Sequence, residues 1–423
     1  MLTRRQSLQV AAGVLAAPVF VRAADDRPAI ALVGCGGMGR GDATNAGRFG
    51  RVVAVCDADA GRAAVAAKQF DAKPYADFRQ MLDTEKQVAV VLNATPDHWH
   101  TLVNIAAVRR GKDVYGEKPL TLTVDEGKRL VAEVKTHGRV FQTGSQQRSD
   151  KLFRQACDVV RTGRLGKLTT VTSTLPAGLR GGPFRPSPVP AGLDWERWQG
   201  QAPATEYVTE RCHTNFRFWA EYSGGSITDW GAHHNDIVRW ALGELGPATV
   251  VGRPTAAPVP GGYSTFSEYE VEYTYPSGVV HRCVSTTAST IFGGAAKQPV
   301  PRSQMAHGIK FEGTTGWLFV TRGKLEASDP AVLTDPFAAS DPRLPVSDDH
   351  MGNFFACVKS RQTPIADAEV GHRSVTVCHL GNIALRLGRK LTWDATSETF
   401  GDDRAANALL AREQRKPWTY DAV

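Results

Sequence analysis

The chain has 423 residues, of which 42% are hydrophobic and 22% are charged, as in ordinary globular proteins. This length accommodates two domains of roughly 100–200 residues each. The formal net charge is +7, and no Lys/Arg cluster is interleaved with aromatic residues, so the composition argues against nucleic-acid binding. No apolar run after the N-terminus approaches the roughly 20 residues that a membrane span needs.

The first 24 residues have the layout of a signal peptide. Arg4 and Arg5 precede Leu8, an Ala/Val/Leu-rich stretch follows to Phe20, and small residues end at Ala24. The adjacent arginines favour the twin-arginine route, with a Sec signal or a plain N-terminal helix as alternatives. We therefore expect a periplasmic or otherwise exported protein that uses the twin-arginine export machinery, which carries folded proteins with cofactors already bound.

A dinucleotide-binding domain is predicted over residues 25–148. The apolar run Ala29–Val33 predicts a buried parallel strand, and the following segment 34–39 reads G-C-G-G-M-G before a helix. In this G-x-G-x-x-G motif Gly34 allows a tight turn, Gly36 admits the pyrophosphate, and Gly39 lets the helix pack against the strand. A second strand is predicted at 51–56, and an acidic residue, Asp57, follows it directly.

Asp57 lies 18 residues beyond Gly39, close to the spacing of the carboxylate that binds the ribose hydroxyls. This carboxylate would repel a 2′-phosphate, so NAD is expected and NADP is less favoured. Arg62 is near enough in sequence to weaken that preference.

Three further groups of polar residues follow predicted strands, where ligands of open α/β sheets bind. Strands are expected at 88–93, 113–115 and 140–142, with a helix that begins at Thr123 and ends near Gly138. The residues at these strand ends are Thr95-Pro96, Glu117-Lys118 and Gln146, and His98 and His100 follow shortly after the first of them.

From about Ser149 the pattern becomes rich in strands, which predicts an α+β domain over residues 149–423. The expected strands lie at 168–173, 268–275, 279–283 and 309–312, and the Pro- and Gly-rich stretch 175–200 is expected to be a long loop. The seven cysteines are scattered without a C-x-x-C pair, so neither a zinc site nor a disulfide framework is predicted.

Asp229 and His233 are four residues apart, a spacing that puts both on one face of a helix. Oxidation of an alcohol needs a base for the hydroxyl proton, and histidine suits that role near neutral pH. We expect Asp229 to orient His233 and Lys118 to share the proton. His234 and Asp236 are weaker candidates for substrate contacts, and no third ligand with settled spacing supports a metal site.

Four motifs together resemble the glucose-fructose oxidoreductase, inositol dehydrogenase and MocA (Gfo/Idh/MocA) family. They are the glycine loop at 34–39, A-T-P-D-H-W-H at 94–100, E-K-P at 117–119 and G-G-S-I-T-D-W-G-A-H-H-N-D at 224–236. The resemblance covers nearly the whole chain after the signal. It implies that Lys118 lies beside the nicotinamide, that Asp229 and His233 contact the substrate, and that an open, mainly antiparallel sheet packs in a homo-oligomer.

The resemblance and the motifs give a set of expected site residues. The catalytic residues are Lys118, Asp229 and His233. The cofactor-binding residues are Gly34, Gly36, Gly37, Met38, Gly39, Asp57, Arg62, Thr95, Pro96, His98, His100, Glu117, Lys118 and Gln146. The substrate-binding residues are Arg148, His213, Arg217, Asp229, His233 and His234, with Gln147, Asn215 and Trp219 as further candidates for sugar contacts.

Three functions remain open at this point. The first is an NAD(P)-dependent oxidoreductase acting on a hydroxyl of a sugar, glycoside or cyclitol, with a retained cofactor because an exported enzyme has no obvious partner to recycle NADH. The second is a glycoside hydrolase or lyase that uses NAD for a transient oxidation. The third is a non-catalytic nucleotide-binding or sensory protein, which the intact Lys118, Asp229 and His233 argue against.

Overall fold

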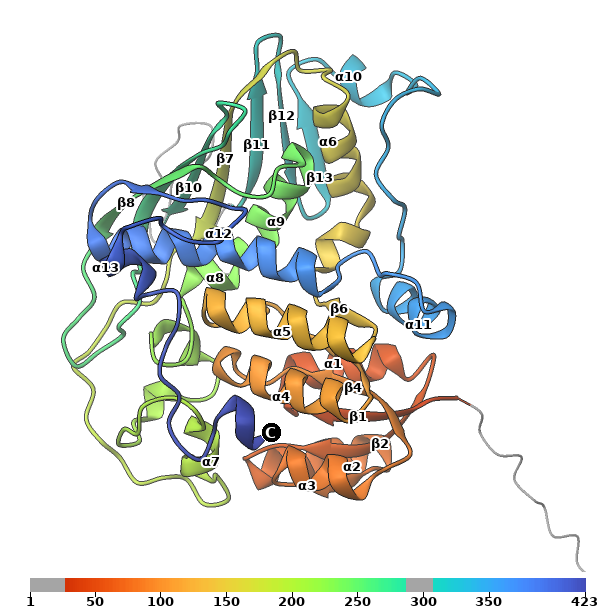
Figure 1. Cartoon of the computed structure of the whole chain (residues 1–423), viewed down its shortest axis with the longest axis vertical. Helices are drawn as coiled ribbons and strands as arrows, with labels where there is room; N and C mark the ends of the chain where they lie inside the picture. The colour runs from red at the N-terminus through yellow and green to blue at the C-terminus, as the bar shows by residue number, and fades with distance from the viewer. Residues whose placement is uncertain (1–26, 287–306) are drawn as a thin grey trace, which may run out of the picture.

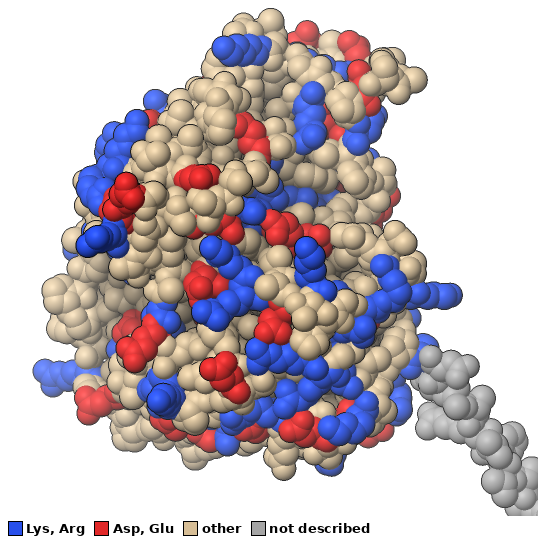
Figure 2. Space-filling model, in the orientation of Figure 1, with Lys and Arg blue, Asp and Glu red and all other residues tan. Residues whose placement is uncertain are grey.

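The computed structural model describes residues 27–286 and 307–423. In Figure 1 its two sheets lie one above the other, with helices between them. The predicted signal peptide lies outside the described residues. Within them, no helix is both long enough and apolar enough to cross a membrane. Basic and acidic side chains are interspersed over the face shown in Figure 2.

The first domain is a Rossmann fold, as predicted. Six parallel strands lie in the order β3-β2-β1-β4-β5-β6, and the order reverses direction between β1 and β4. The strands are β1 (Ala29–Val33), β2 (Arg51–Cys56), β3 (Lys73–Tyr75), β4 (Val88–Asn93), β5 (Asp113–Gly116) and β6 (Phe141–Thr143). The helices are α1 (Gly37–Ala46), α2 (Ala60–Phe70), α3 (Phe78–Thr84), α4 (Asp97–Arg109) and α5 (Val124–His137).

Local sequence explains the ends of α5. The Thr123 side chain accepts a hydrogen bond from the Glu126 amide, and Gly138 ends the helix in a left-handed conformation with φ of 57°. The predicted start at Thr123 and end at Gly138 are therefore confirmed, whereas the Glu126 carboxylate accepts from the Leu122 amide at 2.7 Å and does not complete a capping box with Thr123.

The second domain is built on an eight-stranded sheet in the order β13-β12-β11-β7-β10-β9-β8-β14. Among the described strands of this sheet, β7 and β10 alone pair in parallel, so the expectation of a mainly antiparallel sheet is confirmed. The strands are β7 (Leu168–Pro176), β8 (Thr249–Ala256), β9 (Glu268–Thr274), β10 (Val280–Thr286), β11 (Gly308–Gly313), β12 (Trp317–Thr321), β13 (Lys324–Ala327) and β14 (Leu391–Thr392). Four of these matched expected strands, whereas β8, β12, β13 and β14 were not predicted.

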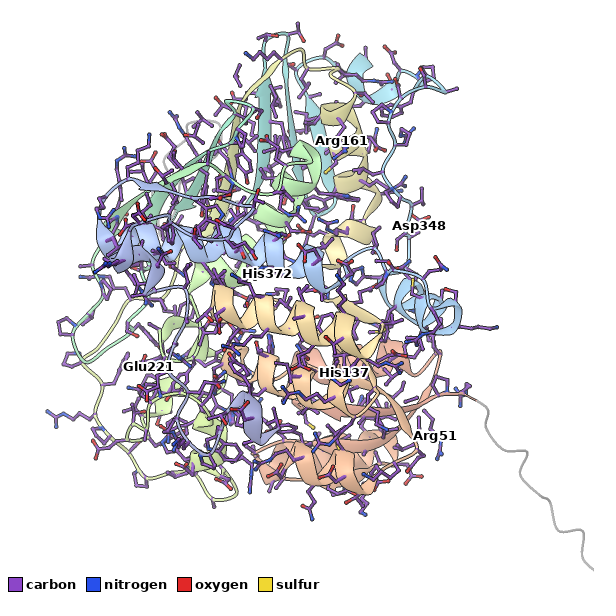
Figure 3. The ribbon with its side chains drawn as sticks, in the orientation of Figure 1. Arg51, His137, Arg161, Glu221, Asp348 and His372 are labelled. Carbon is purple, nitrogen blue, oxygen red and sulfur yellow. The ribbon has the colours of Figure 1, made fainter. Side chains whose placement is uncertain are left out.

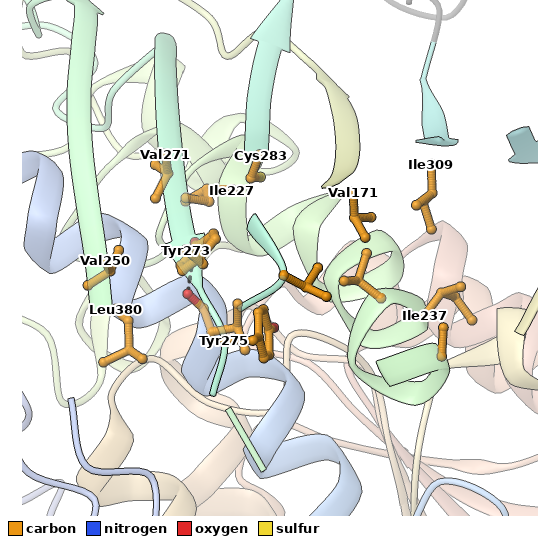
Figure 4. Close-up of a cluster of buried hydrophobic side chains, with 14 of the residues drawn as sticks. Val171, Ile227, Ile237, Val250, Val271, Tyr273, Tyr275, Cys283, Ile309 and Leu380 are labelled. Carbon is orange, nitrogen blue, oxygen red and sulfur yellow. Dashed lines mark hydrogen bonds between the residues drawn. The ribbon is translucent and has the colours of Figure 1, made fainter. Parts of the chain in front are cut away.

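One face of this sheet carries the apolar core of the second domain. In β9 the buried residues Tyr269, Val271 and Tyr273 alternate with partly exposed glutamates, and the Tyr273 hydroxyl donates to the Val377 carbonyl of the covering helix at 2.9 Å. Figure 4 shows sheet residues Val171, Val271, Tyr273, Cys283 and Ile309 beside helix residues Ile237 and Leu380. The helices concerned are α6 (Lys151–Arg161), α9 (Gly231–Leu242) and α12 (Ala368–Leu387), and the shorter helices are α7 (Trp195–Gln199), α8 (Ser226–Asp229), α10 (Ala331–Thr334), α11 (His350–Ser360) and α13 (Arg404–Asn407).

The chain returns to the Rossmann domain twice after residue 148. Met351, Phe354 and Phe355 of α11 pack in the same cluster as strand residues of the first sheet, and Trp418 packs with Phe78. In Figure 1, α12 runs between the two sheets and the C-terminal end lies against the first domain. Position along the chain therefore does not divide the two domains cleanly.

Candidate active site

The glycine loop between β1 and α1 admits only glycine at its critical positions. Gly34 has φ of +90°, and a Cβ on it would lie 2.5 Å from the Ala94 carbonyl carbon. A Cβ on Gly39 would lie 2.0 Å from the Gly34 oxygen. Gly37, by contrast, faces open space, and no side chain caps the first amides of α1. This cradle leaves backbone N–H groups for an anionic group such as a pyrophosphate.

A cavity of about 380 Å³ opens from this loop. Most of the expected cofactor-binding residues line it: Gly34, Gly36, Gly37, Met38, Gly39, Asp57, Arg62, Thr95, Pro96, His100, Glu117 and Lys118. Three aromatic residues far along the chain line it as well, namely Trp198, Phe216 and Trp418.

Asp57 stands at the end of β2, inside this nucleotide cavity. Its carboxylate accepts hydrogen bonds from the Cys35 amide at 2.7 Å and the Asp59 amide at 2.9 Å. Burial raises the pKa of Asp57, while those amides and Arg62 oppose the increase. The amides fix the carboxylate in the place where the Rossmann fold binds ribose hydroxyls, so the residues present fit a dinucleotide.

The two histidines of the segment 94–100 have different surroundings. His100 bridges two loops, with Nδ1 2.6 Å from the Pro119 carbonyl and Nε2 2.9 Å from the Thr95 carbonyl. His98 is fully buried, bonds the Trp198 carbonyl at 2.9 Å and does not line the cavity. Burial lowers the pKa of His98 to about 3, so its ring is neutral. The structure therefore gives His98 a packing position and not the expected contact with the cofactor.

A second cavity, of about 910 Å³, adjoins the nucleotide cavity. We call it the substrate cavity. The four residues that line both cavities are Met38, Lys118, Thr214 and Arg217. The others lining the substrate cavity include Asp42, Gln146, Gln147, Asp150, Asn215, Asp229, Trp230, His233 and Arg322. Polar side chains beside the aromatic rings of Phe218 and Trp230 are the chemistry that a polyhydroxylated ligand requires.

Lys118 stands in the wall common to the two cavities. Its Nζ donates to Asp229 twice, to Oδ1 at 2.8 Å and to the main-chain oxygen at 3.1 Å. Arg217 also donates to Asp229 Oδ1, at 3.2 Å. Asp229 thus fixes both cations that face the two cavities, and Glu117 holds the Lys118 amide at 3.1 Å.

The helix expected to carry both Asp229 and His233 is interrupted. It ends as α8 at Asp229 and restarts as α9 at Gly231, and the His233 amide bonds the Trp230 oxygen at 3.0 Å. The His233 amide thus bonds Trp230, and the Asp229 main-chain oxygen accepts a hydrogen bond from Lys118.

His233 lines the substrate cavity, but its Nδ1 does not donate a hydrogen bond to Asp229. This atom is buried and has no hydrogen-bond partner among the described residues. Burial, with help from Lys118 and Arg322, lowers the pKa of His233 well below its ordinary value, and Asp229 opposes this only as a nearby charge. The ring is therefore neutral, and burial makes it a weaker base than an exposed imidazole.

Three residues expected to bind substrate have other partners. Arg148 forms a buried ion pair with Asp236 at 2.8 Å, and neither lines the substrate cavity. His234 bonds His307 at 3.0 Å. His213 lies in the nucleotide cavity, 3.1 Å from Asp59. Gln146 lines the substrate cavity and donates to Glu117 at 2.7 Å. His213, expected to bind substrate, thus lies in the nucleotide cavity, and Gln146, expected to bind the cofactor, lies in the substrate cavity.

Asp42 and Arg322 are site residues that the sequence did not reveal. Asp42 lies one helical turn after Met38, and its Oδ2 is buried without a hydrogen-bond partner in the described chain. Burial and the charge of Glu117 raise the pKa of Asp42 to about 9, so it is protonated at neutral pH. The one sequence signal that could have indicated Asp42 is its position one helical turn after Met38 of the glycine loop. The described residues contain no cluster of His, Cys, Asp and Glu able to hold a metal ion.

Comparison with known proteins gives matches over both domains. The model of the oxidoreductase family with an NAD-binding Rossmann fold matches residues 29–145, and that of the family's C-terminal alpha/beta domain matches residues 180–280 and 313–420. Inositol 2-dehydrogenase 2 of Saccharopolyspora erythraea is 31% identical over 220 residues, which is 51% of this chain and 54% of that protein. Inositol 2-dehydrogenase of Salmonella typhimurium is 36% identical over 119 residues, 27% of this chain and 35% of that protein. The alignments thus span about a third to a half of these relatives.

Solved structures share the fold at low sequence identity. The WlbA dehydrogenase of Bordetella pertussis, in complex with NADH and UDP-GlcNAcA, aligns with a TM-score of 0.65 and 18% identity, covering 87% of this chain and 99% of that one. The aldose-aldose oxidoreductase of Caulobacter crescentus aligns with a TM-score of 0.60 and 19% identity, covering 86% and 99%. Since the two family models together cover most of the described residues and follow the two domains of the fold, this chain belongs to the Gfo/Idh/MocA oxidoreductase family.

Proposed function

We propose that this protein is an NAD-dependent oxidoreductase acting on a hydroxyl group of a sugar, glycoside or cyclitol. The observation that carries the proposal is the position of Lys118, in the wall shared by the nucleotide cavity and the substrate cavity. The inositol 2-dehydrogenases among the relatives and the NADH-bound neighbour support the same chemistry. NAD is favoured over NADP because the Asp57 carboxylate would lie against a 2′-phosphate.

The nicotinamide supplies a hydride acceptor when it is bound. Lys118 positions the reacting hydroxyl: an ammonium group has three N–H donors, and Asp229 accepts from Nζ at two oxygens, which leaves a donor for the substrate. His233 accepts the hydroxyl proton, because its ring lines the substrate cavity and the nearby Asp229 charge stabilises the protonated form against the effect of burial. The alcohol carbon loses a hydride and its hydroxyl oxygen loses the proton, so the product is a carbonyl whose oxygen stays beside Lys118.

The contacts of the substrate with the rest of the cavity follow from its unpartnered polar atoms. Both polar atoms of the Gln147 side chain are buried without a hydrogen-bond partner in the described chain. A buried polar group without a partner costs about 1–3 kcal/mol, and a ligand hydroxyl removes this cost because it both donates and accepts. We therefore assign Gln147 to ligand hydroxyls other than the reacting one.

A second candidate function is a glycoside hydrolase or lyase that oxidises the sugar transiently. Elimination after such an oxidation needs an acid for the leaving oxygen, and the protonated Asp42 carboxyl lines the substrate cavity. In this case glycosidic cleavage would occur with no net change in NADH.

One experiment separates the two functions. The protein is purified without added nucleotide, mixed with a panel of sugars, glycosides and cyclitols, and followed by the absorbance of bound NADH together with product analysis. A change in NADH with a keto product supports the oxidoreductase, whereas cleavage without net change supports the hydrolase. His233→Gln should reduce turnover by about 10²–10⁴-fold, while the exposed His137→Gln serves as control; equal turnover of both variants would refute the role of His233.

We further propose that residues 1–24 direct export by the twin-arginine route, that the folded protein carries its cofactor with it, and that the subunits form a homo-oligomer. Replacing Arg4 and Arg5 with lysine should abolish export of the full chain in a fractionation assay. Export that persists after the double replacement would favour the Sec alternative. Light scattering of the purified protein measures the oligomeric state.

A further inference from the structure

The nucleotide cavity has an apolar end that the glycine motif does not explain. Beyond Asp57 its walls are Phe78 at the start of α3, Trp99 of α4, Trp198 of α7 and Trp418. The Trp418 ring packs edge-on against Trp99, with centroids 5.3 Å apart. Aromatic walls of this kind suit a flat heteroaromatic base.

Trp418 has a polar atom with no assigned role. The residue is 6% exposed, and its Nε1 is buried with no hydrogen-bond partner among the described residues. A buried indole N–H ordinarily finds an acceptor. In a residue that lines a cavity, such an atom points to an acceptor on the ligand.

The segment 412–423 is attached both to the Rossmann domain and to the wall around α7. Arg109 of α4 donates to the Val423 oxygen at 3.1 Å, and Arg129 of α5 lies over the Tyr420 ring at 4.9 Å. On the other side, Arg415 donates to the Ala202 oxygen at 2.9 Å. The segment therefore joins two parts of the molecule across the apolar end of the cavity.

The same segment also contacts the loop that precedes α8, the helix that ends at Asp229. Arg412 donates to the Glu221 oxygen at 2.6 Å, and Glu221 is labelled beside this part of the chain in Figure 3. Gln414 donates to Gln201 Oε1 at 2.9 Å. The α7 wall itself is attached to α4, because Trp99 Nε1 donates to the Trp198 oxygen at 2.9 Å.

We propose that Trp418 is a wall of an adenine pocket, with its Nε1 donating to the adenosine end of the dinucleotide, and that the segment 412–423 retains the cofactor by closing this pocket. The inference rests on the proposed function, since it deepens the assignment of the nucleotide cavity. It adds a recognition element from outside the Rossmann domain. It also gives a physical basis for a cofactor that stays bound through export, since release requires the segment to detach from both sides.

The test compares two halves of the dinucleotide. Dissociation constants for ADP-ribose and for nicotinamide mononucleotide are measured by calorimetry on the full chain, for the wild type, Trp418→Phe, Trp418→Ala and the control Lys135→Ala, an exposed residue of α5 outside the segment. We expect Trp418→Ala to weaken ADP-ribose binding about 30-fold or more, and Trp418→Phe to weaken it about fivefold because it keeps an aromatic face, though a smaller one, and loses the donor. Nicotinamide mononucleotide binding and the control should be unchanged. Trp418→Ala should also lose nucleotide on gel filtration.

Each other outcome overturns the inference in a recognisable way. Unchanged ADP-ribose affinity in both Trp418 variants removes Trp418 from the site, while the proposed function survives. Equal losses for both half-ligands show a general disruption and not an adenine pocket. If Trp418→Ala does not fold, as judged by its melting curve, Trp418→Phe alone decides the matter. If the wild type binds neither NAD nor ADP-ribose, the proposed function falls as well.

Discussion

The nucleotide cavity is shaped by main chain at its phosphate end, whereas the substrate cavity is shaped by side chains from several distant elements. In the first, Gly34 and Gly39 let backbone approach backbone, and one short loop provides most of the cradle. In the second, Asp42, Gln147 and His233 all present buried polar atoms without partners in the described chain. The difference indicates that the fold itself selects the cofactor, while replaceable side chains select the substrate.

Lys118 joins the two cavities, so its replacement should have the largest effect on turnover. Lys118→Met is expected to reduce turnover about 10³-fold, because it removes the donor at the reacting oxygen and leaves Asp229 and Arg217 misplaced. Nucleotide binding should change little, because the Nζ partners all belong to Asp229. The measurement is single-turnover NADH formation alongside NAD affinity, with the exposed Lys128→Met as control. Parallel loss of NAD affinity and turnover would mean that the two cavities are not separable at this residue.

A matched pair of glycine variants tests the main-chain character of the nucleotide cavity. Gly34→Ala forces a left-handed residue to carry a Cβ 2.5 Å from the Ala94 carbonyl carbon, so we expect NAD affinity to fall about 100-fold and the Tm to decrease. Gly37→Ala adds its Cβ where no heavy atom lies within 4 Å, and should stay within about threefold of wild type. Fluorescence titration with NAD gives both values. Similar affinities in the two variants would contradict a steric basis for the motif.

The contrast between a local main-chain loop and side chains from distant elements also explains how much of the site could be predicted from the sequence. The glycine loop and Asp57 follow from local spacing, and both lie in the nucleotide cavity as expected. The motif that holds His98 and His100 did not show which one faces the ligand, because two residues apart on α4 they point to different sides. Asp42 carries no motif at all. Its raised pKa depends on burial and on Glu117, which follows β5 and is brought close to Asp42 by the tertiary fold.

The interruption between α8 and α9 shows the limit of a periodicity argument. The four-residue spacing of Asp229 and His233 predicted one helix and a direct pair, but the break gives the Asp229 carbonyl to Lys118, which is 111 positions away in sequence. Likewise Trp418, which belongs to no predicted motif and lies near residue 423, lines the nucleotide cavity. Contacts between such distant positions depend on tertiary packing, which local pattern does not encode.

Asp57 provides a test of intermediate size within the nucleotide cavity. Asp57→Ser removes the carboxylate that would repel a 2′-phosphate, while Arg62 remains in the cavity wall. The ratio of NADP to NAD affinity should rise about tenfold. Asp71→Asn is the matched control, since it removes an exposed carboxylate at a left-handed position that asparagine tolerates. An unchanged ratio would show that specificity for the ribose is set elsewhere.

Asp42 provides the smallest effect and the one most diagnostic of the substrate cavity. Its pKa is raised to about 9 in the folded chain from 3.8, so the unfolded chain loses this proton first as pH rises. The stability of the wild type should therefore fall between about pH 4 and about pH 9 on account of this group. Asp42→Asn removes the titration and should be more stable by roughly 1–3 kcal/mol near pH 8, with little difference near pH 4. Thermal melts across this range, with the exposed Asp348→Asn as control, measure the slope. A variant with the same pH dependence as wild type would mean that the Asp42 carboxyl is already ionised in the folded protein. The substrate cavity would then hold a fixed negative charge, and Asp42 would no longer qualify as the acid that the hydrolase alternative requires.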